Sequence, residues 1–127
     1  QIMSMVEPNS ICIFDDVDGS AKTMPELHRF MLACFTRGRH KSILPIVIRH
    51  TLFGGYSETS VLHSEAKNTI LMLRSPLSQI RKYLQKKIGL TTKEVRQQLK
   101  MARGSSYLWV NQNAPSFISS SRHITVL

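Results

Sequence analysis

Hydrophobic positions along the chain form short unbroken apolar runs separated by longer stretches with a helical period. Residues 11–14 (ICIF) and 43–48 (ILPIVI) contain no charged or strongly polar position. Runs of this kind are typical of strands that are buried on both faces of a sheet. A third apolar run covers 69–73 (TILML), and residues 107–110 and 123–126 are predicted to be closing strands.

The first helical stretch follows Thr23, which has the T-x-x-E spacing of a capping box with Glu26. Pro25 lies in the first turn, where a missing N–H costs nothing. We expect this helix to end at the basic stretch 37–41, with Gly38 as its terminator. Its apolar positions recur at i, i+3, i+4, i+7 and i+8: Leu27, Phe30, Met31, Cys34 and Phe35.

Two further helices are predicted in the second half of the chain. One runs from Pro76 to Gly89, and the next begins with a second capping box formed by Thr91 and Glu94. The inward positions are Leu77, Ile80, Leu84 and Ile88 in the former helix and Val95, Leu99 and Ala102 in the latter.

The alternation of strands and helices predicts an α/β fold with a mostly parallel sheet flanked by helices. Ligands of such sheets bind at the carboxyl ends of the strands. Asp15 and Asp16 follow the first strand, and a loop that begins at Arg49 follows the second. We therefore expect a functional site where these two strands end.

The acid pair suits nucleotide hydrolysis. Asp15 is placed to hold Mg²⁺, and Asp16 to orient and deprotonate a water beside a γ-phosphate. His50, at the exit of the second strand, is a candidate to sense that phosphate or polarise the water. The alternatives are an ordinary turn, helped by Asp18 and Gly19, and a surface histidine.

Charge is distributed unevenly. The net charge is +9, yet residues 1–73 carry seven Lys/Arg and seven Asp/Glu, whereas residues 74–127 carry ten Lys/Arg and one acid. This asymmetry indicates a polyanionic partner, nucleic acid first and a membrane surface second. Four cations of the last helix share one face, which either tracks DNA phosphates without reading bases or is simply solvated: Lys93, Arg96, Lys100 and Arg103.

The basic stretch 37–41 also has two interpretations. Arg37, Arg39 and His40 complement the helix dipole at a helix end. Alternatively, one arginine reaches the nucleotide of a neighbouring subunit and stabilises transition-state charge.

The chain has features of an intracellular protein. No apolar run approaches the ~20 residues needed to span a bilayer, and the polar start does not resemble a signal peptide. Cys12 and Cys34 lie in apolar patterns without metal-ligand spacing, as buried thiols of a reducing compartment do. We expect a location inside a cell, with no secretion and no membrane partner.

In their order along the chain, these stretches resemble the DNA-packaging ATPases of large DNA viruses and of virus-like Polinton/adintovirus elements. Those proteins belong to the FtsK–HerA superfamily of P-loop DNA translocases. The resemblance runs from Ile11 to about Leu127. It rests on ICIFDD (11–16) as the Walker B strand, TRGRH (36–40), HTLF (50–53) and ILMLRSP (70–76) followed by QI (79–80).

The resemblance implies an ATPase that uses Mg²⁺ and ATP to drive double-stranded DNA into a capsid, as a homo-oligomeric ring with capsid proteins as partners. It also implies a location in the nucleus or cytoplasm of a host cell or in a virion. It makes Asp15 the magnesium-coordinating acid and Asp16 the catalytic acid, and it places Arg37 and Arg39 in the basic motif of the family. His50 stands where the family usually has a glutamine sensor.

No G-x-x-x-x-G-K-[ST] occurs in the sequence. Because the P-loop of the family lies upstream of Walker B, the resemblance implies that residues 1–127 are the C-terminal part of a P-loop packaging-ATPase domain, with a basic region at 74–127. The strand that carries the P-loop would lie between the second and third strands, so we expect unpaired edges there and no ATP turnover by this chain alone. Two alternatives stay open: a non-catalytic basic nucleic-acid-binding module, and a relic without activity.

Overall fold

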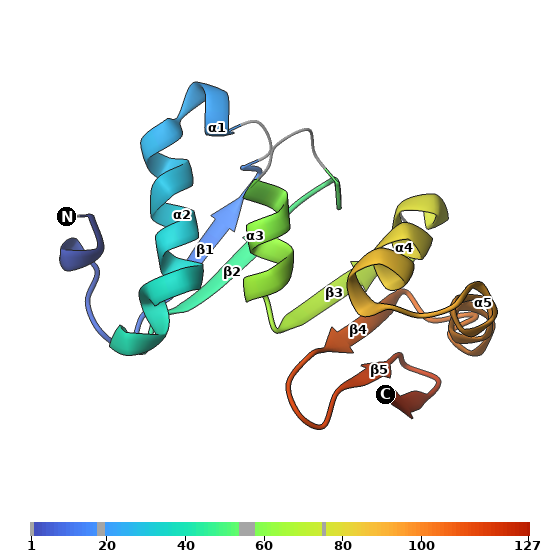
Figure 1. Ribbon diagram of the computed structural model, residues 1–127. Coiled ribbons are helices and arrows are strands. Elements are labelled where there is room, and N and C mark those ends of the chain that lie inside the picture. The colour runs from blue at the N-terminus through green and yellow to red at the C-terminus, as the bar shows by residue number, and fades with distance from the viewer. Residues whose placement is uncertain (1, 18–19, 54–57, 75) are drawn as a thin grey trace. The chain divides into compact units, whose positions relative to one another are not determined.

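A computed structural model describes residues 2–17, 20–53, 58–74 and 76–127 (Figure 1). The chain divides into two compact units, Gln1–Glu65 and Ala66–Leu127, which we call the N-terminal and C-terminal units. Each unit has its own small sheet and its own helices.

The N-terminal unit is built on two parallel strands, β1 (Ile11–Asp15) and β2 (Leu44–Ile48). Ile11 lies opposite Leu44 and Asp15 opposite Ile48, so the carboxyl ends of the strands are level. The remaining elements are η1 (Ile2–Met5), α1 (Ser20–Thr23), α2 (Pro25–Arg37), η2 (Gly38–Lys41) and α3 (Glu58–Glu65).

Helix α2 packs on one face of this sheet through the apolar stripe predicted for it. Met31 and Cys34 are almost completely buried, and the rings of Phe30 and Phe14 meet edge to face with centroids 5.6 Å apart. The buried core of the unit consists of Phe14, Val17, Met31, Cys34, Ile43 and Leu62.

The prediction that these strands are buried on both faces is wrong. Ile11 and Ile13 are each 63% exposed, because within the described part of the unit α2 covers one face of the sheet and leaves the other open. The open face of the N-terminal unit carries Ile11, Ile13, Leu44, Ile46 and Ile48.

The predicted start of α2 also needs correction. Thr23 is the last residue of α1, so it is not available as an extended N-cap residue; Met24 is the N-cap and makes no side-chain capping hydrogen bond. The helix does end at Arg37, but Gly38 has φ −60° and continues into η2. Glycine avoids a tight contact there, since a Cβ would lie 3.3 Å from the Cβ of Ile43.

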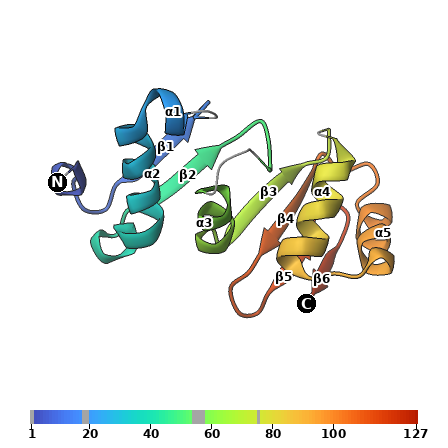
Figure 2. The ribbon, with the colours of Figure 1, turned by 45° about the horizontal axis from the view of Figure 1, so that its top comes forward.

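The C-terminal unit is a four-stranded antiparallel sheet in the order β3–β4–β5–β6, with helices on one side (Figure 2). Its strands are β3 (Asn68–Met72), β4 (Tyr107–Asn111), β5 (Phe117–Ser119) and β6 (Ile124–Val126). Its helices are α4 (Leu77–Tyr83), the π-helical turn η3 (Leu84–Ile88) and α5 (Thr92–Met101).

The core of this unit lies between the sheet and the helices. Tyr83 is fully buried, and its hydroxyl donates a hydrogen bond of 3.0 Å to Oγ1 of Thr69 on β3. The other buried apolar side chains are Leu71, Leu108, Val110 and Ile118 from the sheet and Ile80, Leu84, Val95 and Ala102 from the helical side.

The predicted mostly parallel sheet is therefore wrong: β1 and β2 are parallel, but β3 to β6 form a separate antiparallel sheet. The short connections 112–116 and 120–123 enforce this for β4, β5 and β6, because neighbouring strands joined by so few residues pair antiparallel. Strand β5 was not predicted, since it has three residues in a serine-rich stretch, and neither was α3, which lacks a clear apolar stripe.

The sheet of the C-terminal unit also has an open apolar face, formed by Ile70, Met72, Trp109, Ile124 and Val126. Among the described residues, β2 pairs only with β1 and β3 pairs only with β4, so each has an unpaired edge. An unpaired edge and an apolar face are both suited to further packing.

Candidate nucleotide site and basic surface

The acid pair lies in a sharp turn at the end of β1. Asp15 is the last residue of the strand, and Asp16 has the left-handed backbone conformation with φ 53°, which aspartate tolerates better than most residues. Val17 then returns to the core. The turn therefore leaves the Asp16 side chain 80% exposed while both of its neighbours in the chain are anchored.

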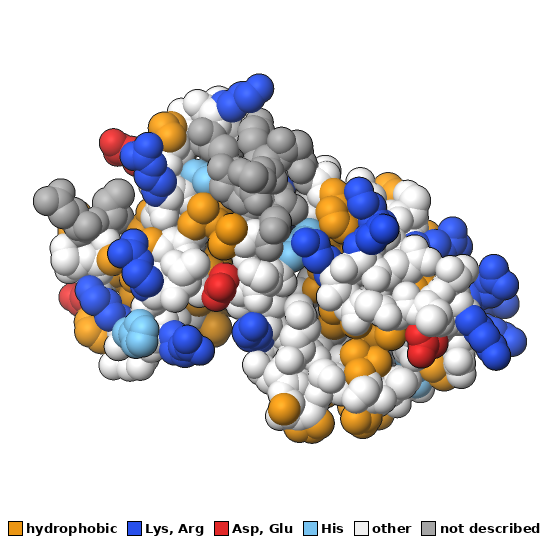
Figure 3. All heavy atoms as spheres, viewed as in Figure 1, with side chains coloured by type: hydrophobic (Ala, Val, Ile, Leu, Met, Phe, Trp, Pro, Cys, Tyr) orange, Lys and Arg blue, Asp and Glu red, His pale blue; other side chains and the backbone are white. Residues whose placement is uncertain are grey.

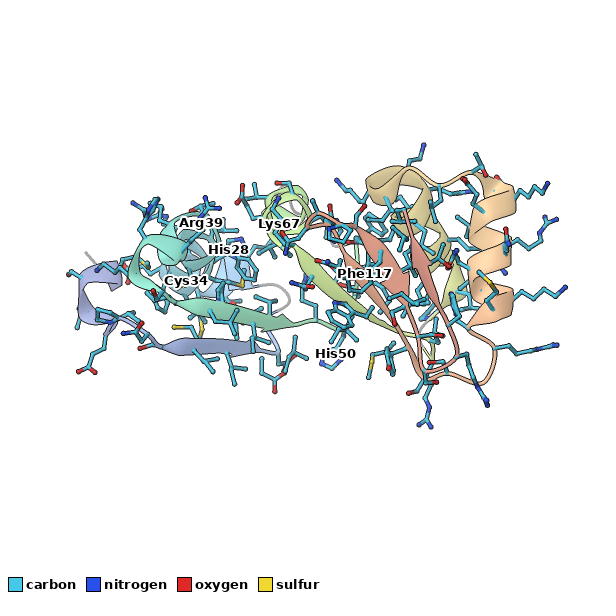
Figure 4. The ribbon with its side chains drawn as sticks, turned by 90° about the horizontal axis from the view of Figure 1, so that it is seen from below. His28, Cys34, Arg39, His50, Lys67 and Phe117 are labelled. Atoms are coloured by element: carbon cyan, nitrogen blue, oxygen red, sulfur yellow. The ribbon has the colours of Figure 1, made fainter. Side chains whose placement is uncertain are left out.

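His50 lies beside this turn. Its Nε2 atom is 3.6 Å from Oδ1 of Asp16, because the carboxyl ends of two paired parallel strands are adjacent. This distance suits an ion pair when the imidazole is protonated, and it is too long for a direct hydrogen bond. With both side chains more than 70% exposed, the pair itself contributes little stability. Figure 4 shows His50 at this end of the sheet.

Two carboxylates next to each other are a donor set that Mg²⁺ accepts, since this ion is commonly held by one or two carboxylates together with phosphate oxygens and waters. The side chain of Asp15 follows the alternation of Ile11 and Ile13 and lies on the open face of the sheet. Within the ranges that the structure describes, no three acidic, histidine or cysteine side chains gather as a metal site. Asp18, Gly19, Gly54 and Gly55 lie outside the described residues.

The basic stretch lies at the other end of the same sheet. Arg37 ends α2, while Arg39 and His40 belong to η2, just before β2 begins, and all three are exposed. Asp16 and His50 lie where β2 ends, so the five residues of the strand separate the two groups by about 13 Å. Figure 4 shows Arg39 and His50 at opposite ends of β2.

Lys41 differs from its neighbours in this stretch. Its Nζ atom donates a hydrogen bond of 2.8 Å to the carbonyl oxygen of Met3, which fixes η1 to η2. One cation of the stretch therefore has a structural role.

The predicted basic face on α5 is solvent-exposed. Lys93, Arg96 and Lys100 project from the helix, Arg103 follows its end, and Val95 is buried on the opposite side. Figure 3 shows Lys and Arg side chains gathered over this part of the C-terminal unit. Nothing on α5 resembles a base-reading motif, so DNA binding by this face would be made to phosphates and would not depend on the base sequence.

Glu94 is the one acidic residue of the sequence between Ala66 and Leu127. Its carboxylate accepts hydrogen bonds from N (2.7 Å) and Oγ1 (2.8 Å) of Thr91, while its own N–H donates to Thr91 Oγ1 (3.2 Å). The predicted capping box is thus confirmed. These hydrogen bonds lower the pKa of Glu94 and hold its charge at the start of the helix.

A partly buried polar network, which no spacing along the sequence predicts, joins α5 to β6 and to the connection that precedes it. Gln98 is only 5% exposed; its Oε1 accepts a hydrogen bond from Nε2 of His123 (2.9 Å), and its Nε2 donates one to Oγ1 of Thr125 (3.2 Å). Its spacing of three from Val95 places it within the inward stripe, where an apolar residue is the usual occupant.

The two cysteines are free thiols, Cys34 buried and Cys12 partly buried. Burial, with a smaller contribution from Cys12, raises the pKa of Cys34 to about 11. A thiol of this kind is protonated and unreactive at neutral pH.

No protein-family model, curated protein or solved structure matches this chain. In the described part of the chain no helix has the length and apolar character that crossing a membrane requires. The resemblance to packaging ATPases therefore stays a prediction.

Proposed function

We propose that this chain is the part, from the Walker B strand onward, of an ATPase that translocates double-stranded DNA into a viral capsid. The observation that carries the proposal is the placement of Asp16 beside His50 where the parallel strands β1 and β2 end. In this role Asp15 holds Mg²⁺, Asp16 activates the attacking water, and His50 senses the γ-phosphate.

The unpaired edges and open apolar faces support the view that catalysis needs a further segment. The edge of β2 is next to Asp16 and His50, so a strand added there would bring its loop to the acid pair. A phosphate-binding loop with its lysine is what the sequence lacks. We therefore expect no ATP turnover by the chain alone, and turnover that Asp16→Asn abolishes would contradict this.

The positions of the arginines agree with a ring of identical subunits. Arg37 and Arg39 are a strand length away from the acid pair of their own chain, so an arginine that acts in catalysis would serve the nucleotide of a neighbouring subunit. Double-stranded DNA and capsid proteins are the other proposed partners, with the basic face of α5 toward the DNA.

Paramagnetic relaxation tests the metal site on the chain as it is. Mn²⁺ with a non-hydrolysable ATP analogue should broaden the backbone amide signals of Asp15, Asp16 and His50, and Asp15→Asn should remove most of this effect. Glu26→Gln, a change to an exposed acid in the first turn of α2, is the matched control and should leave it intact. Equal broadening in the wild type and Asp15→Asn would refute the metal role.

A non-catalytic basic nucleic-acid-binding module is the second candidate, favoured by the concentration of exposed cations in the C-terminal unit. DNA binding together with a failed Mn²⁺ experiment would select it. Under either function, loss of the α5 cations should flatten the plot of log K against log salt by roughly 0.9 per lost phosphate contact. An unchanged slope would exclude α5 from DNA binding.

A further inference from the structure

The C-terminal unit has a surface groove between its two helical segments. The groove encloses about 310 Å³. Arg81 from α4 and Arg96 from α5 line it from different helices, and the apolar side chains of Val95 and Leu99 on α5 also line it. The remaining lining residues are Gln85 and Thr92.

The two walls of the groove are joined to each other. Nε2 of Gln85 on η3 donates a hydrogen bond of 3.1 Å to Oγ1 of Thr92, the first residue of α5. Gly89, with φ 85°, ends η3 and lets the chain reverse into α5. The spacing between Arg81 and Arg96 is therefore set by the fold, which lowers the cost of ordering both side chains around one ligand.

The electrostatic surroundings favour an anion. Eleven Lys/Arg and a single acid occur between Ala66 and Leu127, and that acid, Glu94, is hydrogen-bonded to Thr91. A guanidinium group binds phosphate oxygens through two parallel N–H donors. Two such groups on facing walls suit one phosphate, and an apolar floor suits the sugar beside it.

We propose that this groove holds the phosphodiester backbone of one DNA strand, with Arg81 and Arg96 on the same phosphate and the deoxyribose over Leu99. The proposal rests on the DNA-binding role proposed for α5 and extends it, because Arg81 comes from α4 and was not among the predicted DNA contacts. The contact surface then covers two helical segments.

Salt-dependent binding of a fluorescently labelled DNA duplex tests the role of Arg81. Arg81→Ala should weaken binding at least about tenfold at low salt and reduce the slope of log K against log salt by roughly 0.9. Lys87→Ala is the matched control, since it removes one exposed cation of η3 outside the groove and should leave the slope almost unchanged. Arg81→Lys, which keeps the charge without the planar fork, should fall between them.

The outcomes separate this inference from the proposed function. Equal slopes for Arg81→Ala and Lys87→Ala would refute the proposal that the groove binds DNA. A smaller slope on replacing Lys93, Lys100 and Arg103 would still support DNA binding by α5. An unchanged slope in all of these variants would exclude DNA binding by the groove and by the basic face of α5. Polyglutamate that binds as tightly as DNA with the same dependence on Arg81 would identify an acidic peptide as the occupant and refute the phosphate assignment.

Discussion

Replacing Gln98 by leucine is expected to destabilise the C-terminal unit, because this side chain joins the basic helix α5 to strand β6. Gln98 is almost completely buried, and both ends of its amide are used: Oε1 by His123 and Nε2 by Thr125. Leucine fills a similar volume, so the change tests the hydrogen bonds more than the packing.

The proton positions in this network follow from its geometry. Ser120 Oγ accepts hydrogen bonds from the N–H groups of Arg122 (3.0 Å) and His123 (3.3 Å), so its own proton is directed to Nδ1 of His123 at 2.9 Å. Nδ1 of His123 then accepts from Ser120, and Nε2 of the same ring donates to Gln98 Oε1. Both ends of the Gln98 amide and both ring nitrogens of His123 thus have a partner.

Gln98→Leu removes two hydrogen bonds and leaves the donor of His123 and the hydroxyl of Thr125 without this partner. Each neutral hydrogen bond contributes about 0.5–1.5 kcal/mol, so the sum is about 1–3 kcal/mol. Because His123 and Thr125 are only partly buried, water can replace part of the loss. We therefore expect a free energy of unfolding that is lower by about 2 kcal/mol.

Urea unfolding followed by the fluorescence of Trp109 measures this change, since the single tryptophan of the chain lies on β4 of the same unit. Gln97→Leu is the matched control: it makes the same chemical change at the adjacent, exposed position of α5. A loss below about 0.5 kcal/mol for Gln98→Leu, or equal losses for the two variants, would refute the reasoning.

Three further changes test local features of the fold. Thr91→Ala should lower the free energy of unfolding of the C-terminal unit by about 1 kcal/mol through loss of the capping box. The pKa of Glu94 in the folded state lies below its ordinary 4.5, so the stabilisation from this carboxylate is present above pH 4.5 and disappears as the pH falls through the folded pKa. Urea unfolding at a series of pH values would detect this loss. Gly89→Ala should cost about 1 kcal/mol in the same assay, because alanine at φ 85° is strained although the space around it is open; no loss would contradict that assignment. Met31→Ala should lower the free energy of unfolding of the N-terminal unit by about 2–5 kcal/mol, as measured by denaturant unfolding followed by far-ultraviolet circular dichroism. An unchanged free energy would mean that α2 does not pack as described.

Local patterns in the sequence were sufficient for several elements. An unbroken apolar run predicted β1, and the T-x-x-E spacing of Thr91 and Glu94 predicted the start of α5, because each depends on neighbours within a few residues. The same spacing failed at Thr23, where the preceding residues form α1 and remove the extended conformation that an N-cap needs. A motif of this kind is therefore informative only when the residues before it are not helical.

The arrangement of strands depends on connections that a local pattern does not contain. The apolar run of β3 resembles those of β1 and β2, yet β3 pairs antiparallel with β4, a strand from the far end of the chain. The unbroken apolar run around Ile13 predicted burial on both faces, but Ile13 faces solvent, because helices cover one side of this sheet within the described residues. Ile70 on β3 is exposed for the same reason. The apolar pattern thus indicates that these faces are suited to packing against other apolar surfaces, whereas the fold decides whether a helix covers them.

The candidate site shows the same division. The proximity of Asp16 to His50 follows from the parallel pairing of two strands that the sequence did predict. The Gln98 network and the groove between Arg81 and Arg96 depend on how α4 and α5 pack, so no spacing along the chain predicts them.

The positions of the charged groups in the N-terminal unit bear on how subunits would assemble under the proposed function. Asp16 lies at the carboxyl end of the parallel pair and Arg39 at the amino end, so the two ends of the strands carry opposite charges. In a two-fold interface between antiparallel units, the acid pair of each subunit would meet the arginines of the other, and the assembly would close with two subunits. A head-to-tail interface instead places the arginines of one subunit at the acid pair of the next, and such an interface closes into a ring when its rotation is a fraction of a full turn. Under the proposed function, a head-to-tail ring is therefore the arrangement that would let both charged ends of this unit act on one nucleotide in an assembly of more than two subunits.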